Sequence, residues 1–368
     1  MSISNRMHFL DNLRAFVIIL VIVLHGSITY MAYAPSWWYV LDPNNSEAFT
    51  LLVLLIDVPI MPMLFFLAGY FALPSLQKRG VRQFLKEKFI RIGLPWIFGA
   101  LFLAPLTAYM IYFSRNVPMG YLQFWATDFW GELYQQSVYW FLGILMVLFA
   151  GLGFVYTQSD RLHTSTRRIA LPSRRLFVVF MAAVTGAVVA INLFVHIDNW
   201  SHIYLLVFQP ARVPLYIGYL GLGLYAERRG WFTAGGFNPE LGPWAWTCFL
   251  TGLGYLACRW TSAAPNLLLT IGTAILFNAF CLSSLIAGVM FFRQRVNNGE
   301  GMWRSLAASS YGMYYIHPLI LYPLAYLFVG ISLPLLVKAL ALILTAALLA
   351  WGMSALLLKR VPILREMF

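Results

Sequence analysis

The sequence predicts an all-α membrane protein, a bundle of about ten transmembrane helices that forms a single domain over residues 1–368. Three observations lead to this prediction. Hydrophobic residues make up 61% of the chain and charged residues only 10%, against about 25% charged residues in typical soluble domains. Apolar runs long enough to cross a bilayer recur along the whole chain. Basic residues gather in every second connection between these runs. The composition excludes a soluble globular protein.

The predicted spans are the apolar runs that approach the length of about 20 residues needed to cross the hydrocarbon core. The run 243–258 is short, and the run 203–226 contains Arg212. In chain order the runs cover 13–34, 49–74, 94–113, 138–157, 176–195, 203–226, 243–258, 267–292, 305–328 and 333–357.

The charges between the runs predict the topology independently. The connections 75–92 and 158–175 are strongly basic, and the connections 227–242 and 293–304 add Arg228, Arg229, Arg293, Arg295 and Arg304. The intervening connections contain mainly acids, namely Asp42, Glu47, Asp128, Glu132 and Asp198. This alternation predicts that both termini lie on the cytoplasmic side. Because the net charge of +12 follows this pattern, it indicates contact with a lipid bilayer and not with nucleic acid.

The sequence gives no indication of a metal or disulfide site. The three cysteines lie in or beside apolar runs and lack CxxC spacing. His196, Asp198 and His202 match no usual metal-site spacing, so we interpret them as a solvated turn. The first apolar run has no small-residue cleavage site, and we expect it to remain as the first span.

Ionisable residues inside spans are functional candidates, because each costs several kcal/mol there. Arg14 and His25 are 11 residues apart, which places them within ~20° of one helix face and ~16 Å apart along the axis. Arg14 lies near the cytoplasmic end, where it can bind a phosphate or serve as a snorkelling anchor. His25 reaches mid-membrane, where it can be catalytic or can simply hydrogen-bond a neighbouring helix.

Three more polar residues lie within predicted spans. His317 reaches the depth of His25, so the two imidazoles can share one cavity. Pro318 offers an alternative, in which His317 only satisfies backbone groups freed at a proline kink. Asp57 and Arg212 enter from the opposite side. They can form an ion pair, or Asp57 can orient His25. Pro59 and Pro62 predict a bend in the second span, beside a cavity.

Five blocks of sequence carry a family resemblance. FLDNLRAFVIILVIVLHGSITY, with ten residues between Arg14 and His25, resembles the first-helix motif of the acyltransferase 3 family of membrane acyltransferases. The blocks FFLAGYF at 65–71, KEKFIRIGLPW at 86–96, YWFLGILM at 139–146 and SSYGMYYIHPLI at 309–320 follow in the family's order. The chain looks most similar to the branch that succinylates periplasmic glucans, although Met61, Pro62 and Met63 depart from that branch's pattern.

The resemblance implies a multi-pass protein of the bacterial inner membrane that takes an acyl group from cytoplasmic acyl-CoA, either acetyl-CoA or succinyl-CoA. The acceptor it implies is a polysaccharide or oligosaccharide on the far side. His25 then takes the catalytic role and Arg14 the donor-side role, while Lys88 and Arg91 bind the phosphates of coenzyme A. We expect Asp57, Arg212 and His317 to contact substrate, and a tunnel to cross the bundle.

Two other functions use some of the same features. A glycan transporter or flippase also needs polar groups at mid-membrane, but it needs no thioester donor. A scaffold protein would tolerate substitution of Arg14 and His25. The stripe from Arg14 to His25 and the basic connection 75–92 favour the acyltransferase.

Overall fold

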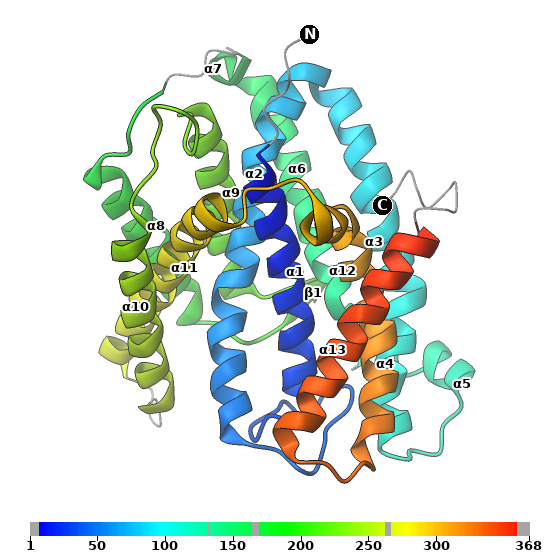
Figure 1. The fold of residues 1–368 in the computed structure, drawn as a ribbon. Helices are drawn as coiled ribbons and strands as arrows, with labels where there is room; N and C mark the ends of the chain where they lie inside the picture. The colour runs from blue at the N-terminus through cyan, green and yellow to red at the C-terminus, as the bar shows by residue number, and fades with distance from the viewer. Residues whose placement is uncertain (1–6, 132, 164–168, 262–265, 359–368) are drawn as a thin grey trace.

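The computed structural model describes residues 7–131, 133–163, 169–261 and 266–358. The structure is 76% helical, and Figure 1 shows the long helices lying side by side in one bundle. A short antiparallel hairpin pairs β1 (Ser201–Ile203) with β2 (Leu206–Phe208), and Ser201 lies opposite Phe208. The predicted all-α class is therefore confirmed, with this hairpin as a small addition.

The helices have the following bounds. They are α1 (His8–Ile28), α2 (Glu47–Lys88), η1 (Phe89–Gly93), α3 (Leu94–Phe98), η2 (Gly99–Leu103), α4 (Ala104–Ser114), α5 (Tyr121–Ala126), η3 (Ser137–Tyr139), α6 (Trp140–Gln158), α7 (Asp160–His163), α8 (Arg174–Asn192), η4 (Pro210–Arg212), α9 (Val213–Arg228), α10 (Leu241–Thr261), α11 (Leu267–Arg295), α12 (Gly301–Val329), α13 (Leu335–Met353) and η5 (Ser354–Leu358).

Within the described residues, seven helical stretches are long and apolar enough to cross a membrane. One of them, Glu47–Ser114, is 68 residues long and contains two of the predicted spans, 49–74 and 94–113. The predicted spans at 203–226 and 243–258 correspond to α9 and α10, which are not among the seven; α9 has only 16 residues. The count of ten and the cytoplasmic side therefore stay predictions.

Backbone geometry divides the 68-residue stretch. α2 continues through Pro59 and Pro62, and its non-helical backbone angles are at Gly80, with φ 74° and ψ 164°. A positive φ favours glycine because a Cβ would be strained there. In Figure 1, α2 rises to the upper end of the bundle and the chain then turns back. The 68-residue stretch can therefore cross a membrane twice. The break thus lies beyond the prolines from which we predicted a bend.

Glycines bring α2 and α9 into close contact. A Cβ on Gly69 would lie 2.1 Å from the carbonyl oxygen of Leu220, and one on Gly223 would lie 2.1 Å from that of Phe66. Small residues allow such approach between membrane helices. The contact fixes Asp57, on α2, beside the start of α9.

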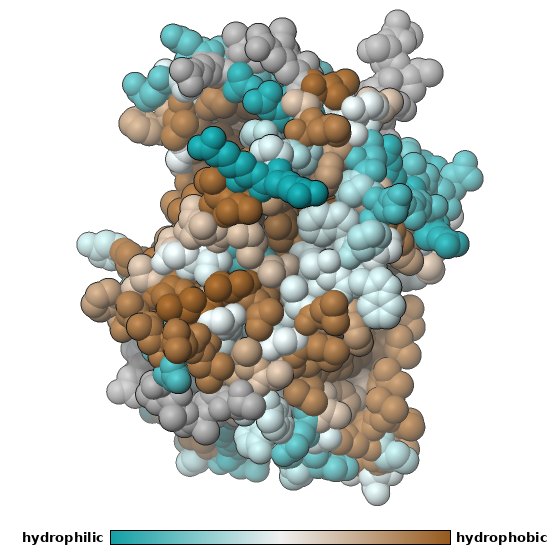
Figure 2. All heavy atoms as spheres, turned by 90° about the vertical axis from the view of Figure 1, so that its left-hand side faces the viewer, coloured by the Kyte–Doolittle hydropathy of each residue, from teal (hydrophilic) through white to brown (hydrophobic). Residues whose placement is uncertain are grey.

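The outer face over α8 and α10 is strongly apolar. Figure 2 shows a broad band of hydrophobic side chains across it. Val178, Val179, Phe249 and Leu250 are 66%, 55%, 54% and 63% exposed. Exposed apolar residues at this density are expected of a surface that contacts lipid, which supports a multi-pass membrane protein.

Candidate functional site

Two histidines contact each other at the centre of the site. His25 lies in the last turn of α1, and its Nδ1 is 3.0 Å from Nε2 of His317 on α12. The Nδ1 of His317 is 2.7 Å from the carbonyl oxygen of Tyr314. His317 is wholly buried, whereas His25 is partly exposed. The structure thus brings the imidazoles of His25 and His317 together, with His317 on the buried side of His25.

These contacts determine where the protons are. The carbonyl of Tyr314 can only accept, so His317 donates to it from Nδ1–H. A second proton on His317 would create a buried cation, which is costly, so its Nε2 accepts from Nδ1–H of His25. The neutral His25 ring then has no proton on Nε2. That nitrogen is the one available as a base or nucleophile.

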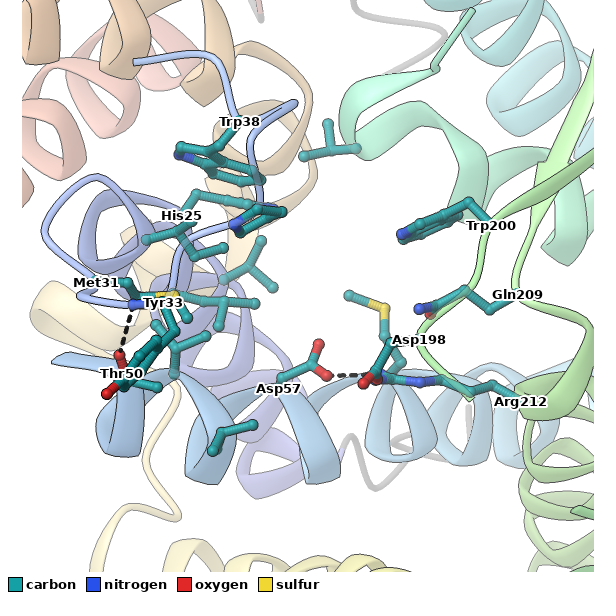
Figure 3. Close-up of a pocket in the computed structure, with 18 of the residues that line it drawn as sticks. His25, Met31, Tyr33, Trp38, Thr50, Asp57, Asp198, Trp200, Gln209 and Arg212 are labelled. Carbon is teal, nitrogen blue, oxygen red and sulfur yellow. Dashed lines mark hydrogen bonds and ion pairs between the residues drawn. The ribbon is translucent and has the colours of Figure 1, made fainter. Parts of the chain in front are cut away.

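His25 lines a cavity of about 750 Å³ at the end of the bundle opposite the start of α1. The segment after α1 covers one side of it, where the Trp38 ring stacks on His25 with centroids 5.7 Å apart and planes 16° from parallel. Trp200 and Gln209 lie across the cavity from His25 (Figure 3). Cavities of this size with a few polar groups on aromatic walls are typical of ligand sites.

Four charged residues form a chain in the cavity wall, which we call the charge chain: Asp57, Arg212, Asp198 and Arg259. Arg212 donates from Nη1 to Oδ2 of Asp57 at 2.6 Å and from Nη2 to Oδ1 of Asp198 at 3.0 Å. Arg259 donates from Nη2 to Oδ2 of Asp198 at 2.6 Å. Figure 3 shows Asp57, Asp198 and Arg212 meeting across the cavity from His25. Asp57 therefore pairs with Arg212 and does not orient His25.

Asp198 lies in the connection between α8 and β1, outside the long helices. Burial alone would raise the pKa of its carboxyl group, but the guanidinium groups of Arg212 and Arg259 hold that pKa below its usual range. Asp198 is therefore an anion in the cavity wall.

The predicted donor-side residues lie at the other end of the bundle, which we call the basic end. Arg14 on α1 is 3.4 Å from Asp11 and 41% exposed. Lys88, at the end of α2, lies near enough to Arg91 and Arg14 to interact with them electrostatically. Its Nζ is 4.7 Å from the centre of the Phe149 ring. Arg14, Lys88 and Arg91 thus form a basic group well separated from His25.

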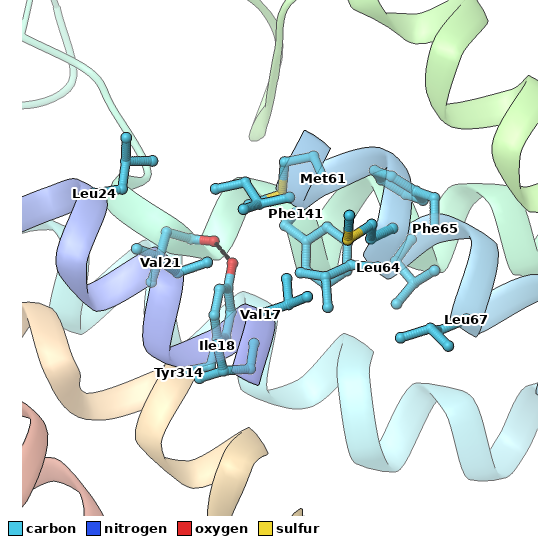
Figure 4. Packing of buried hydrophobic residues seen from close by; sticks show 14 of the residues in the cluster. Val17, Ile18, Val21, Leu24, Met61, Leu64, Phe65, Leu67, Phe141 and Tyr314 are labelled. Carbon is cyan, nitrogen blue, oxygen red and sulfur yellow. Dashed lines mark hydrogen bonds between the residues drawn. The ribbon is translucent and has the colours of Figure 1, made fainter. Parts of the chain in front are cut away.

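A packed hydrophobic layer lies between the basic end and His25, where we predicted a tunnel. Val17 and Val21 of α1 pack beside Phe65 of α2, and all three are 0% exposed. Figure 4 shows these side chains together with Met61, Leu64, Phe141 and Tyr314. These side chains close part of the path between Arg14 and His25 along α1, and Val21 and Met61 also line the cavity of His25. A continuous tunnel along this path requires the layer to move.

Sequence reasoning missed part of the site. His317 was expected to contact substrate, but it is buried behind His25 and reaches the cavity through that ring. Asp198, interpreted as a solvated turn, belongs to the charge chain, and so does Arg259, which follows a predicted span. Trp38, in the connection after α1, covers His25. The sequence does contain a signal that could have identified Asp198, because this carboxylate lies shortly before the segment that contains Arg212.

Comparison with protein families identifies the family to which this chain belongs. A family model described as an acyltransferase domain, that of the acyltransferase 3 family, matches residues 7–355. The chain belongs to this family. The membership confirms the resemblance inferred from the five sequence blocks, and with it the acyltransferase class. No solved structure matches the chain significantly.

The curated proteins that resemble this acyltransferase 3 member share only low sequence identity with it. The chain is similar to glucans biosynthesis protein C from Salmonella schwarzengrund, Salmonella typhi and Salmonella typhimurium, at 23% identity over 186 residues in each case. The match covers 48% of this chain and 46% of each relative. The chain thus spans about half the length of the relatives that it matches.

Proposed function

We propose that this acyltransferase 3 family member is an O-acyltransferase of the bacterial inner membrane that moves an acetyl or succinyl group from cytoplasmic acyl-CoA to a hydroxyl of an extracytoplasmic glycan. The observation that carries the proposal is the chain of hydrogen bonds from Tyr314 through His317 to His25, which leaves Nε2 of His25 without a proton in a cavity wall. Family membership supplies the reaction class.

The donor binds at the basic end in this proposal. Coenzyme A has several phosphate groups, and Arg and Lys side chains bind phosphates through charge-assisted hydrogen bonds. Arg14, Lys88 and Arg91 are grouped there. The thioester then enters between α1 and α2 as the layer of Val17, Val21 and Phe65 opens. Acyl transfer thus includes a conformational step.

His25 acts at the thioester in one of two ways. As a general base, its Nε2 takes the proton of the acceptor hydroxyl while that oxygen attacks the thioester carbon. The carbon–sulfur bond breaks, and the proton passes to the thiolate leaving group. As a nucleophile, Nε2 attacks the thioester carbon itself and releases the thiolate. The hydroxyl oxygen of the acceptor then attacks the acyl group on Nε2, the carbon–nitrogen bond breaks, and the hydroxyl proton balances the thiolate. Both routes need Nε2 unprotonated.

His317 positions His25 in either route. Its Nε2 accepts the Nδ1–H bond of His25, which holds the ring in one tautomer and one orientation. A partly positive His25 ring in the transition state would strengthen this bond. His317 is therefore a positioning residue and makes no substrate contact.

Donor consumption by the purified protein tests the proposal. Radiolabelled acetyl-CoA and succinyl-CoA are supplied to wild type and His25→Ala with a glucan oligosaccharide, and free thiol and labelled sugar are measured. We expect wild type to release thiol and label the sugar, and His25→Ala to lose at least about 100-fold in rate, because a positioned base contributes about that much. His163→Ala, an exposed histidine on α7, is the matched control.

Equal rates for wild type and His25→Ala would remove His25 from the mechanism. If neither donor is consumed while unmodified oligosaccharide crosses the vesicle membrane, the protein is a glycan transporter.

A further inference from the structure

In the charge chain, the two carboxylates are more exposed to the cavity than the two guanidinium groups. The side chains of Asp57 and Asp198 are 34% and 40% exposed, against 8% for Arg212 and 24% for Arg259. The two acids and two bases cancel in charge. A ligand at this wall therefore finds carboxylate oxygens that accept hydrogen bonds in a region without net charge.

A buried hydroxyl points independently to a polar ligand. Tyr216, on α9, lines the same cavity and is 1% exposed. Its hydroxyl has no hydrogen-bond partner among the residues that the structure describes. It lies near enough to Asp57 and Arg212 to interact with both electrostatically. Buried hydroxyls are nearly always hydrogen-bonded in proteins, so a ligand group is the natural partner.

The remaining walls are aromatic. Besides Tyr216, the large rings that line the cavity are those of Tyr33, Trp37, Trp38, Trp140, Trp200, Tyr255, Trp260 and Tyr314. Flat rings pack well against the C–H faces of a sugar, while hydroxyl groups on its rim donate to carboxylates in strong, charge-assisted bonds. A cation would also suit the rings, but Arg212 and Arg259 repel it. An anion would be repelled by Asp57 and Asp198.

We propose that the charge chain and Tyr216 form the acceptor subsite and that they select an uncharged sugar. In this arrangement a sugar hydroxyl donates to Asp57, another bonds the Tyr216 hydroxyl, and the ring packs on the aromatic wall opposite Trp38. A different hydroxyl of the same acceptor is then presented to Nε2 of His25. This inference rests on the proposed acyl transfer and adds the charge class of its acceptor.

Tyr216→Phe is the cleanest test, because it removes a hydroxyl that has no hydrogen-bond partner in the described part of the chain and leaves the ring stacked on Phe65, with centroids 4.6 Å apart. We expect the KM for a neutral glucan oligosaccharide to rise about fivefold, the loss of one neutral hydrogen bond, with an unchanged melting temperature. An unchanged KM overturns the role of Tyr216 and with it the subsite.

Asp57→Asn is expected to change the KM in opposite directions for neutral and for anionic acceptors. It leaves the charge chain with a net positive charge, so we expect the KM for the neutral oligosaccharide to rise about tenfold and the KM for an oligogalacturonate to fall. A purely structural role for Asp57 would move both KM values the same way, and that result overturns the proposal. Asp160→Asn, fully exposed on α7, is the control.

Donor hydrolysis without acceptor separates this inference from the proposed function. If wild type hydrolyses the donor in a His25-dependent way and the KM values of Tyr216→Phe and Asp57→Asn change as described, both stand. If hydrolysis persists and wild type prefers the oligogalacturonate or a chitosan oligomer, only the subsite is wrong. If wild type consumes no donor, the proposed function fails and the subsite inference fails with it.

Discussion

At the residue scale, the proposed function depends on which nitrogen of His25 carries the proton. The carbonyl of Tyr314 sets the tautomer of His317, and His317 sets that of His25. His25 therefore needs no carboxylate partner, which is consistent with a site inside a membrane, where an unpaired charge is costly.

Replacing His317 tests this arrangement. His317→Phe removes the acceptor for Nδ1–H of His25, and we expect kcat to fall at least about 100-fold with little change in acceptor KM, because base catalysis of that size is lost. His317→Gln, whose side-chain oxygen can accept the same bond, is expected to recover part of kcat. Steady-state kinetics on folded protein measures both, and equal losses in the two variants would argue for a packing role alone.

A buried ion pair holds the segment that covers the site. Nζ of Lys338 on α13 is 2.5 Å from Oδ2 of Asp42 and also donates to the carbonyl of Val329 at 3.0 Å. Both side chains are almost completely buried, at 3% and 1% exposure. Asp42 lies in the segment 29–46, which joins α1 to α2 and includes Trp38. The pair therefore ties the cover of His25 to α13.

Lys338→Met leaves Asp42 buried without its cation. We expect a loss of about 3–5 kcal/mol in stability, the usual cost of breaking a buried pair by removing one partner. Thermal unfolding in detergent measures it, with exposed Lys78→Met as the control. A melting temperature equal to that of the control would show that the pair does not hold this segment.

At the element scale, the contact between α2 and α9 determines whether the charge chain can form. α2 contributes Asp57, and the turn before α9 contributes Arg212. Gly69 and Gly223 let the two backbones approach each other. Any residue that separates these helices should also separate the ion pair.

Gly223→Ala tests this contact. Its Cβ would lie 2.1 Å from the carbonyl oxygen of Phe66, so we expect a lower melting temperature and a raised acceptor KM. Gly221→Ala on the same helix is the matched control, because a Cβ there meets nothing within 4 Å. The control should be neutral or slightly stabilising, since alanine favours helix more than glycine does. Similar melting temperatures for the two variants would contradict the close contact.

The sequence was informative about long elements and about isolated polar residues within them. Hydropathy predicted the all-helical class, and the depth of His25 and His317 predicted that the rings could meet. It could not choose between the two alternatives for Asp57, because that choice depends on how closely α2 and α9 pack. Asp198 and Trp38 lie in connections, where no helical period indicates which way a side chain points.

At the scale of the whole molecule, the proposed function assigns different roles to two regions. The basic end groups Arg14, Lys88 and Arg91, and the far end holds the cavity with His25. The packed layer of Val17, Val21 and Phe65 separates them. An acyl group that starts at one end and finishes at the other must pass this layer, whereas the glycan need not.

Sidedness follows from the same division. In a variant without its native cysteines, we expect Arg82→Cys to be labelled by an impermeant thiol reagent only from the cytoplasmic side, and Tyr204→Cys only from the outside. Both positions are exposed: Arg82 lies in the basic connection 75–92, and Tyr204 lies in the hairpin between β1 and β2. Labelling of both from one side would contradict the predicted topology and the separate donor and acceptor sides.

The most direct test of the central claim is transfer across a sealed membrane. Labelled acyl-CoA is placed only on the side of the basic end in proteoliposomes, and neutral oligosaccharide only on the other, with wild type and His25→Ala compared. The account predicts labelled oligosaccharide on the far side in wild type alone, with coenzyme A retained on the donor side. Equal labelling by the two proteins, or label found only where donor and acceptor have mixed, would contradict it.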